Sequence, residues 1–171
     1  MAIANYLASK ERLKTAYVEL NPSGQIQSLS KHQDKNHFSF QGIHFFAQVK
    51  PSQLSKILQY KFDIFILDFG VYSSLLFYTF LRCDIQFMVG DFSQWRRMDS
   101  LNQLEYIQNT YQLNHKQVTL LDNTITKESF YSKIGNPPLR NYRVPLISNP
   151  FHIASFDFAF YESLWRSINI P

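Results

Sequence analysis

The segment from Phe62 to Gly70 constrains the fold of this chain more than any other part. It reads FDIFILDFG, an apolar run that ends in one carboxylate, Asp68, and then a glycine. An apolar run of this length can be buried on both faces, which is typical of a central strand in a parallel sheet. Ligands of open α/β sheets gather at the carboxyl ends of such strands. Asp68 is therefore the first candidate for a functional side chain.

Strand-like and helix-like segments alternate along the rest of the chain. We expect strands at 15–20, 62–68, 85–90, 118–121 and 142–147, and a hairpin of 37–40 with 43–47 around Gln41 and Gly42. We expect helices at 2–12, 25–30, 51–60, 73–82, 95–111, 127–134 and 158–168. Alternation of this kind implies crossover units. The predicted fold class is α/β, a three-layer arrangement with a mostly parallel sheet flanked by helices, and residues 1–171 are expected to form a single domain.

Composition excludes several classes of protein. With 171 residues and 45% hydrophobic content, the chain can bury one core. The single cysteine, Cys83, excludes an internal disulfide framework and a multi-cysteine zinc site. Neither a signal-peptide pattern nor an apolar run of about 18 residues occurs, so we expect a cytoplasmic protein without a transmembrane segment. The net charge of +4 is only a weak indication of an anionic partner.

Most other chemistry-bearing side chains have an ordinary structural interpretation. The five histidines lack the spacing of zinc sites, and no serine occupies a G-x-S-x-G elbow. The Trp95-Arg96-Arg97 run could contact an anion or a nucleic acid, but a solvated first helical turn explains it equally simply. The apolar helix at 73–82 could face a partner, although such a helix beside a parallel strand is more often buried.

Three segments in series resemble the MinD/ParA superfamily of deviant-Walker ATPases. They are 2–8 (AIANYLA), 15–21 (TAYVELN) and 62–70, in the order and spacing of that family. Within the superfamily the chain looks closest to the CpaE-like branch, because 82–90, 93–96 and 144–151 resemble its later strands and its proline-containing loop. The resemblance implies a P-loop NTPase-like fold over most of the chain.

The same resemblance implies that the nucleotide site is incomplete. In the family, the helix that resembles residues 2–10 follows directly after the phosphate-binding loop, whereas this sequence begins inside that helix. The first strand and the P-loop would then be missing, with the N–H groups and the lysine that hold phosphates. We therefore expect no ATP hydrolysis by this chain alone. ATP and Mg²⁺ are candidate cofactors only where the missing loop is supplied elsewhere.

Five positions carry over from the family pattern. Asp68 matches the Walker-B aspartate, which acts through a magnesium-bound water, and it is the one candidate metal-site residue. Gly70 matches the start of the switch loop. Glu19 and Asn21 stand where the family often has two aspartates, and Asn123 is where relatives can place a base-recognising asparagine. The alternative for Asp68 is a strand-end carboxylate that caps a nearby turn.

Three functions remain open at this point. The chain could be a degenerate or truncated ATPase-like domain, a non-enzymatic interaction module on the same fold, or a receiver-like regulatory domain. The last lacks an acidic pair near its start and a Lys-Pro after a late strand. Loss of a central strand would leave unpaired N–H and C=O groups. The sheet must then be rearranged, completed by another chain or marginally stable, so we expect self-association or a protein partner. A nucleic-acid partner has weaker support.

Overall fold

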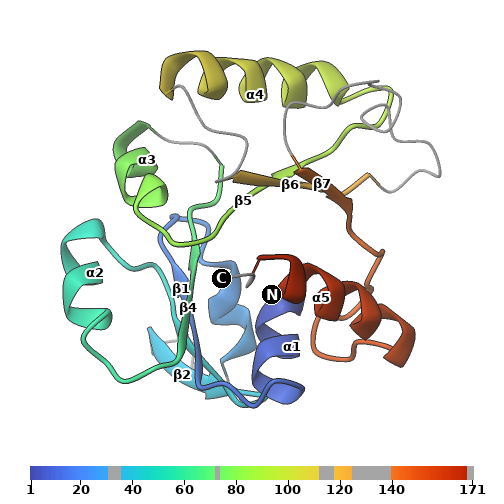
Figure 1. Ribbon diagram of the computed structural model, residues 1–171. Helices are drawn as coiled ribbons and strands as arrows, with labels where there is room; N and C mark the ends of the chain where they lie inside the picture. Colours follow the sequence, from blue (N-terminus) through green and yellow to red (C-terminus); the bar gives the residue numbers. More distant parts are fainter. Residues whose placement is uncertain (31–35, 72–73, 112–117, 125–139, 169–171) are drawn as a thin grey trace. The chain divides into compact units, whose positions relative to one another are not determined.

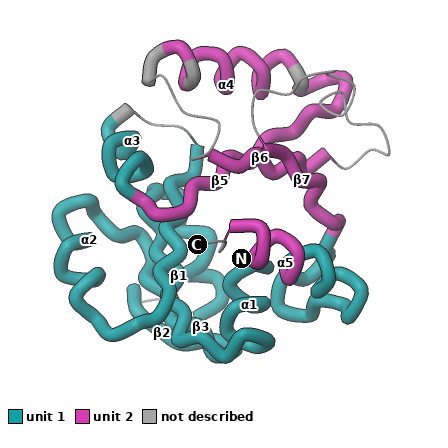
Figure 2. The backbone as a smooth tube through the Cα atoms, viewed as in Figure 1, with its two compact units in different colours: residues 1–82, 147–161 teal, residues 83–146, 162–171 magenta. Residues whose placement is uncertain are grey.

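The computed structural model describes residues 1–30, 36–71, 74–111, 118–124 and 140–168. The chain divides into two compact units, which Figure 2 shows in separate colours. Unit 1 comprises Met1–Arg82 and Ile147–Tyr161, and unit 2 comprises Cys83–Leu146 and Glu162–Pro171. Each unit contains its own sheet, and we describe each by itself.

Unit 1 contains a four-stranded sheet in the order β2-β3-β1-β4 (Figure 1). The strands are β1 Thr15–Glu19, β2 His37–Phe40, β3 Ile43–Phe46 and β4 Ile64–Asp68. Strand β1 pairs in parallel with both β3 and β4, and β2 pairs antiparallel with β3. Gln41 and Gly42 have φ values of 49° and 76°, the left-handed backbone that a tight hairpin requires. The predicted hairpin is therefore confirmed.

Helices cover both faces of this sheet. They are α1 Ala2–Ser9, α2 Pro51–Ile57 and α3 Ser74–Leu81, with a short 3-10 helix, η1, at Gln25–Leu29. Successive side chains of a strand point to opposite faces. Val18 accordingly lies in one buried cluster with Leu54 of α2. Tyr17 lies in another with Ala4 of α1, and Figure 1 draws α1 and α2 on opposite sides of β1 and β4.

Unit 2 contains a three-stranded parallel sheet in the order β5-β6-β7. Its elements are β5 Gln86–Gly90, α4 Arg97–Tyr111, β6 Val118–Asp122 and β7 Arg140–Arg143. Leu104 and Ile107, three residues apart on α4, form a buried apolar face, since they are 3% and 2% exposed. Helix α5, Ser155–Ile168, begins in unit 1 and ends in unit 2.

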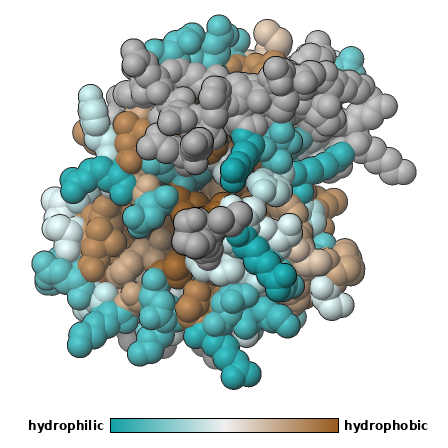
Figure 3. Space-filling view, viewed as in Figure 1, coloured by the Kyte–Doolittle hydropathy of each residue, from teal (hydrophilic) through white to brown (hydrophobic). Residues whose placement is uncertain are grey.

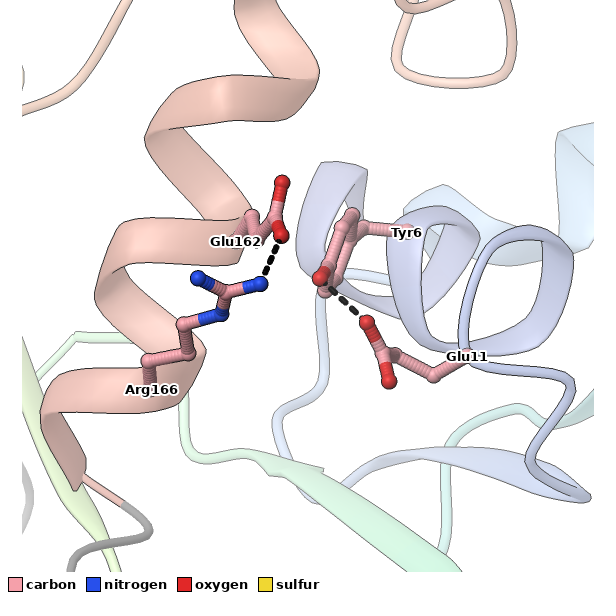
Figure 4. Close-up of polar contacts among 4 residues, drawn as sticks. All are labelled: Tyr6, Glu11, Glu162 and Arg166. Carbon is pink, nitrogen blue, oxygen red and sulfur yellow. Dashed lines mark hydrogen bonds and ion pairs between the residues drawn. The ribbon is translucent and has the colours of Figure 1, made fainter.

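Aromatic packing within unit 1 joins α1 to the first part of α5. The ring of Tyr6 lies 6.0 Å from that of Phe158 and 6.1 Å from that of Tyr161, between centroids. The Tyr6 hydroxyl donates a hydrogen bond to Glu11, just beyond the end of α1, as Figure 4 shows. Figure 4 also shows the ion pair between Glu162 and Arg166, one turn apart on α5. Tyr6, which is fully buried, thus keeps a polar partner for its hydroxyl group.

The predicted fold class is confirmed, with one correction to its central element. Four of the five strand pairings among the described residues are parallel. However, β4 is not a central strand. Among the described strands it pairs with β1 alone and forms an edge of the four-stranded sheet, and all five of its residues are only partly buried. The unit 1 sheet therefore ends on its most apolar strand.

Several element boundaries also differ from the prediction, and α1 and α2, for example, each end three residues earlier than expected. The last strand ends at Arg143 instead of continuing to 147, because Pro145 has no N–H with which to extend the ladder. Val144 still donates to the carbonyl of Asp122, over 2.9 Å. Helix α5 begins at Ser155, three residues before the predicted start. The helix predicted at 127–134 lies outside the described residues, and the single-domain expectation for 1–171 stays a prediction.

Candidate functional site

Four of the five predicted site residues lie together at the carboxyl ends of β1 and β4. Glu19 and Asp68 are the last residues of these two strands and are partners in the parallel register. Asn21 follows β1, and its side-chain amide donates to the Asp68 carbonyl over 3.4 Å. Gly70 packs against Asn21. Parallel strands bring their carboxyl ends to one edge of the sheet, which is why residues 50 positions apart in sequence meet here.

Asp68 uses both of its carboxylate oxygens within the protein. Oδ2 accepts a 2.6 Å hydrogen bond from the Tyr17 hydroxyl, and Oδ1 accepts a 2.8 Å bond from the Gly70 N–H. Burial raises the pKa of Tyr17 above its usual value, and the charge of Asp68 and its hydrogen bond raise it further. Asp68 therefore caps the turn after β4, as the structural alternative predicts. An ionised carboxylate has about four lone-pair directions, so acceptor capacity remains.

Glu19 is a buried carboxylate that ties two loops together. Its side chain is among the largest fully buried ones, and the residue is 1% exposed. Oε1 accepts a 2.9 Å hydrogen bond from the Ser23 hydroxyl, and Oε2 accepts a 3.1 Å bond from the Gln48 N–H. Buried carboxylates need such partners because desolvation of the charge is costly. Glu19 thus fixes the loop after β1 to the loop after β3.

Gly70 allows the backbone to approach Asn21 closely. Its φ of 65° is left-handed, and a Cβ placed there would lie 2.7 Å from the Asn21 Cβ. The Asn21 side chain is held in turn by the Ser23 N–H, which donates to its Oδ1 over 3.0 Å. The position therefore requires glycine for both its conformation and its space.

The start of α1 lies close enough to Asp68 for the two to interact electrostatically. Burial lowers the pKa of the Met1 amino group, and the charge of Asp68 opposes this effect. Among the described residues, no group of three histidine, cysteine or acidic side chains is arranged to hold a metal ion. The assignment of Asp68 as a metal ligand stays a prediction.

Asn123 is not among the residues that the structure brings together. It belongs to unit 2 and follows β6, where its backbone N–H donates to the Gly90 carbonyl over 2.8 Å. Its side chain is exposed. Its predicted role in base recognition stays a prediction.

The sequence analysis missed three residues that organise this site, namely Tyr17, Ser23 and Gln48. Tyr17 could have been found, because it lies two residues before Glu19 and strand alternation places both side chains on one face. Gln48 contributes a backbone N–H and adopts a left-handed φ of 49°. Almost any residue type can supply a backbone N–H, so the sequence does not reveal this contact with Glu19.

The remaining sequence candidates lie elsewhere. On α3, Leu76 and Phe77 are buried as expected, whereas Leu75 is 79% exposed. Trp95 is 89% exposed and Arg96 is also exposed, which agrees with a solvated position before α4. In the part of the chain that the structure describes, no helix has the length and apolar character needed to cross a bilayer.

Comparisons with known proteins identify a fold but not a family. No protein-family model matches the chain, and no curated protein matches it in sequence. Among solved structures, a plasmid partition protein from Borrelia burgdorferi is similar, with a TM-score of 0.61 and 11% sequence identity. The match covers 97% of this chain and 89% of that one. The chain therefore has a ParA-like, P-loop NTPase-like α/β fold.

Proposed function

We propose that this chain is a degenerate MinD/ParA-like domain of the CpaE-like branch. In this proposal the chain does not hydrolyse ATP on its own and acts in the cytoplasm through a protein partner or through self-association. The similarity to a partition protein supports the fold. The resemblance of segments 2–8, 15–21 and 62–70 supports the lineage.

The state of the two carboxylates carries the proposal. Asp68 and Glu19 end neighbouring strands where this fold would place catalytic acids, yet each has both oxygens engaged by the chain's own donors. A general base must reach the proton that it abstracts, and Glu19 is enclosed by Ser23 and Gln48. The carboxylates thus hold loops in place, which is a structural role.

Titration with ATP and Mg²⁺ tests the enzymatic part of this proposal. We expect no phosphate release above that of a heat-inactivated sample. A ligand present at 100 times its dissociation constant would raise the melting temperature of a chain of this size by roughly 5–11 °C. Nucleotide bound beside Asp68 would also shift the NMR signals of Tyr17 and Gly70, and millimolar ATP with Mg²⁺ should give no such shift if the chain is a pure interaction module. A shift without hydrolysis would favour the degenerate-ATPase form.

Hydrolysis that depends on Asp68 would contradict the proposal. The matched variants are Asp68→Asn, which removes the candidate carboxylate, and Asp63→Asn, an exposed aspartate outside β4. Phosphate release that disappears only in Asp68→Asn would show an active site in this chain. Equal release from both variants would indicate a contaminating ATPase and leave the chain without hydrolysis of its own.

Two features of unit 1 support action through a partner. Strand β4 leaves one edge without a strand partner among the described residues, and such an edge is a template for another chain. Beside it in sequence, Val71, Leu75 and Tyr78 are 86%, 79% and 72% exposed. Leu75 and Tyr78 are three residues apart on α3 and therefore lie on one side of that helix, and Val71 precedes the helix in sequence. Figure 3 shows apolar surface in the region of α2 and α3.

A further inference from the structure

A pocket that the candidate site does not use is lined by residues just before β1 and β4 and by residues along β2 and β3, as far as Phe46. Its volume is about 450 Å³. Its lining side chains include Lys14 before β1, His37 on β2, His44 on β3, and Tyr60, Lys61 and Phe62 before β4. We call these six residues the histidine pocket. Asp68 and Glu19 lie at the opposite, carboxyl ends of the same strands.

Ring faces form the walls of the histidine pocket. The His37 ring stacks on Phe46 at 4.2 Å between centroids and 6° between planes. The ring of His44 lies 5.0 Å from that of Phe62, and the His37 and His44 rings lie 5.9 Å apart. Tyr60 extends this cluster, 5.9 Å from Phe46, and remains 50% exposed. Exposed aromatic faces of this kind accept planar rings by stacking.

The charge of the pocket is positive. Lys14 and Lys61 are exposed, and within the described residues neither amino group forms an ion pair. Among the residues that the structure describes, no carboxylate lines the pocket. The nearest acid in sequence, Asp63, is exposed and accepts a 2.8 Å hydrogen bond from the Lys14 backbone N–H. Two unpaired ammonium groups beside aromatic faces suit a ligand that is both anionic and planar.

His37 adds hydrogen-bonding capacity to the pocket without adding full charge. Burial lowers the pKa of His37, and the neighbouring His44 lowers it further. His44 Nδ1 lies 3.1 Å from the Ser39 hydroxyl, so one ring nitrogen already has a partner. Near neutral pH a His37 with a lowered pKa presents an uncharged ring, which can both stack on a heterocycle and hydrogen-bond to it.

We propose that the histidine pocket binds a mononucleotide, with the base stacked against Tyr60 and Phe62 and the phosphate held by Lys14 and Lys61. The volume lies in the range of small-molecule sites, which typically enclose roughly 300–1,000 Å³. Lysine acts as a point charge for phosphate, and a stacked aromatic face is tolerant of base identity. The site is separate from the carboxylates at the other end of the sheet, so it is independent of the proposed function.

Adenosine 5′-monophosphate is the probe, and the ring signals of His37 and His44 in NMR spectra of the whole chain are the readout. We expect saturable shifts of both rings with AMP, and binding at least tenfold weaker with adenosine or inorganic phosphate alone. Nucleotide bound at the other end of the sheet would instead shift Tyr17 and Gly70, so the two proposals fail separately.

Matched variants test the roles of charge and stacking. Replacing both lysines, Lys14→Gln with Lys61→Gln, should weaken AMP binding by roughly three- to thirtyfold, as expected for two exposed ion pairs. Tyr60→Ala should weaken it by about five- to hundredfold. The controls are Lys56→Gln on α2 and Tyr78→Ala on α3, both exposed residues outside the pocket, which should stay within about twofold of the unchanged chain. Thermal unfolding identifies any variant that fails to fold.

Several results would overturn the proposal. They are the absence of saturable histidine shifts at millimolar AMP, equal effects of the pocket and control lysine variants, and adenosine binding as tightly as AMP. A single-stranded oligonucleotide that shifts the histidine rings while AMP does not would assign the pocket to a different class of ligand and would also contradict it.

Discussion

The geometry of the candidate site depends on the absence of a side chain at Gly70. Its left-handed backbone brings it within van der Waals contact of Asn21, and its N–H caps Asp68. A side chain at this position would disturb both neighbours. The same glycine is the residue that the family resemblance assigns to the start of a switch loop. In this chain its contacts give it a packing role.

Replacing Gly70 by alanine should cost more stability than replacing Gly42. Both have a positive φ, 65° and 76°, which costs a non-glycine residue about 1–2 kcal/mol. A Cβ at Gly42 meets nothing within 4 Å, whereas at Gly70 it meets Asn21 at 2.7 Å. We expect Gly70→Ala to lower the free energy of unfolding by about 1–3 kcal/mol more than Gly42→Ala. Urea denaturation measures the difference.

A third variant links that difference to Asn21. Combining Gly70→Ala with Asn21→Gly removes the atoms that the new Cβ would meet, so the two substitutions should be less destabilising together than their sum. Strict additivity would show that the close approach is not the cause of the loss.

At the level of elements, the exposed side chains of α3 are the clearest sign of an interaction. The helix buries Leu76 and Phe77 and exposes Leu75 and Tyr78. Large exposed apolar patches on folded proteins are often interaction sites. Their position shortly after β4 in sequence places them near an edge strand that lacks a neighbour in the described part of the chain.

Introducing charged residues at exposed positions of α3 should weaken self-association. We expect the unchanged chain to show a weight-average mass that rises with concentration in sedimentation equilibrium. Leu75→Glu with Tyr78→Glu should shift the association constant at least tenfold toward the monomer, because each glutamate must be desolvated at the contact. Phe156→Glu on α5 is the control, since Phe156 is similarly exposed, at 77%. A concentration-independent monomer would contradict this form of the proposal.

The helices and strands themselves were predicted from sequence more accurately than the pairing of the strands. The hairpin followed from Gln41-Gly42, and the buried face of α4 followed from Leu104 and Ile107. The edge position of β4 did not follow, because the segment 62–70 that contains it has the composition of a central strand, and composition does not say which strands lie beside it. The end of β7 depended on Pro145, which the predicted strand had included.

The candidate site, too, could be predicted from the sequence only in part. Asp68 and Glu19 could be predicted as neighbours because both end parallel strands. Their hydrogen bonds could not, since the partners include backbone groups of Gln48 and Gly70, which any residue type can supply. Sequence patterns indicate which side chains reach an edge of a sheet. They carry little information about which backbone N–H groups donate hydrogen bonds to those side chains.

At the scale of the whole molecule, the open question is whether two compact units unfold as one. We propose a single domain, so calorimetry should show one transition with equal calorimetric and van't Hoff enthalpies. For 171 residues the total should be roughly 120 kcal/mol near 60 °C. Two resolved transitions, each with part of this enthalpy, would show that the units of Figure 2 are separate domains.

The partly buried strand β4 limits how much of this protein a cell can keep folded and free of aggregates. A short apolar strand with an unpaired edge is the structural element from which intermolecular β-aggregates grow. Chains made in excess over whatever covers that edge would recruit one another. If a partner covers that edge, as we propose, production of this protein has to be matched to that of the partner, and stoichiometry then limits its abundance as much as intrinsic stability does.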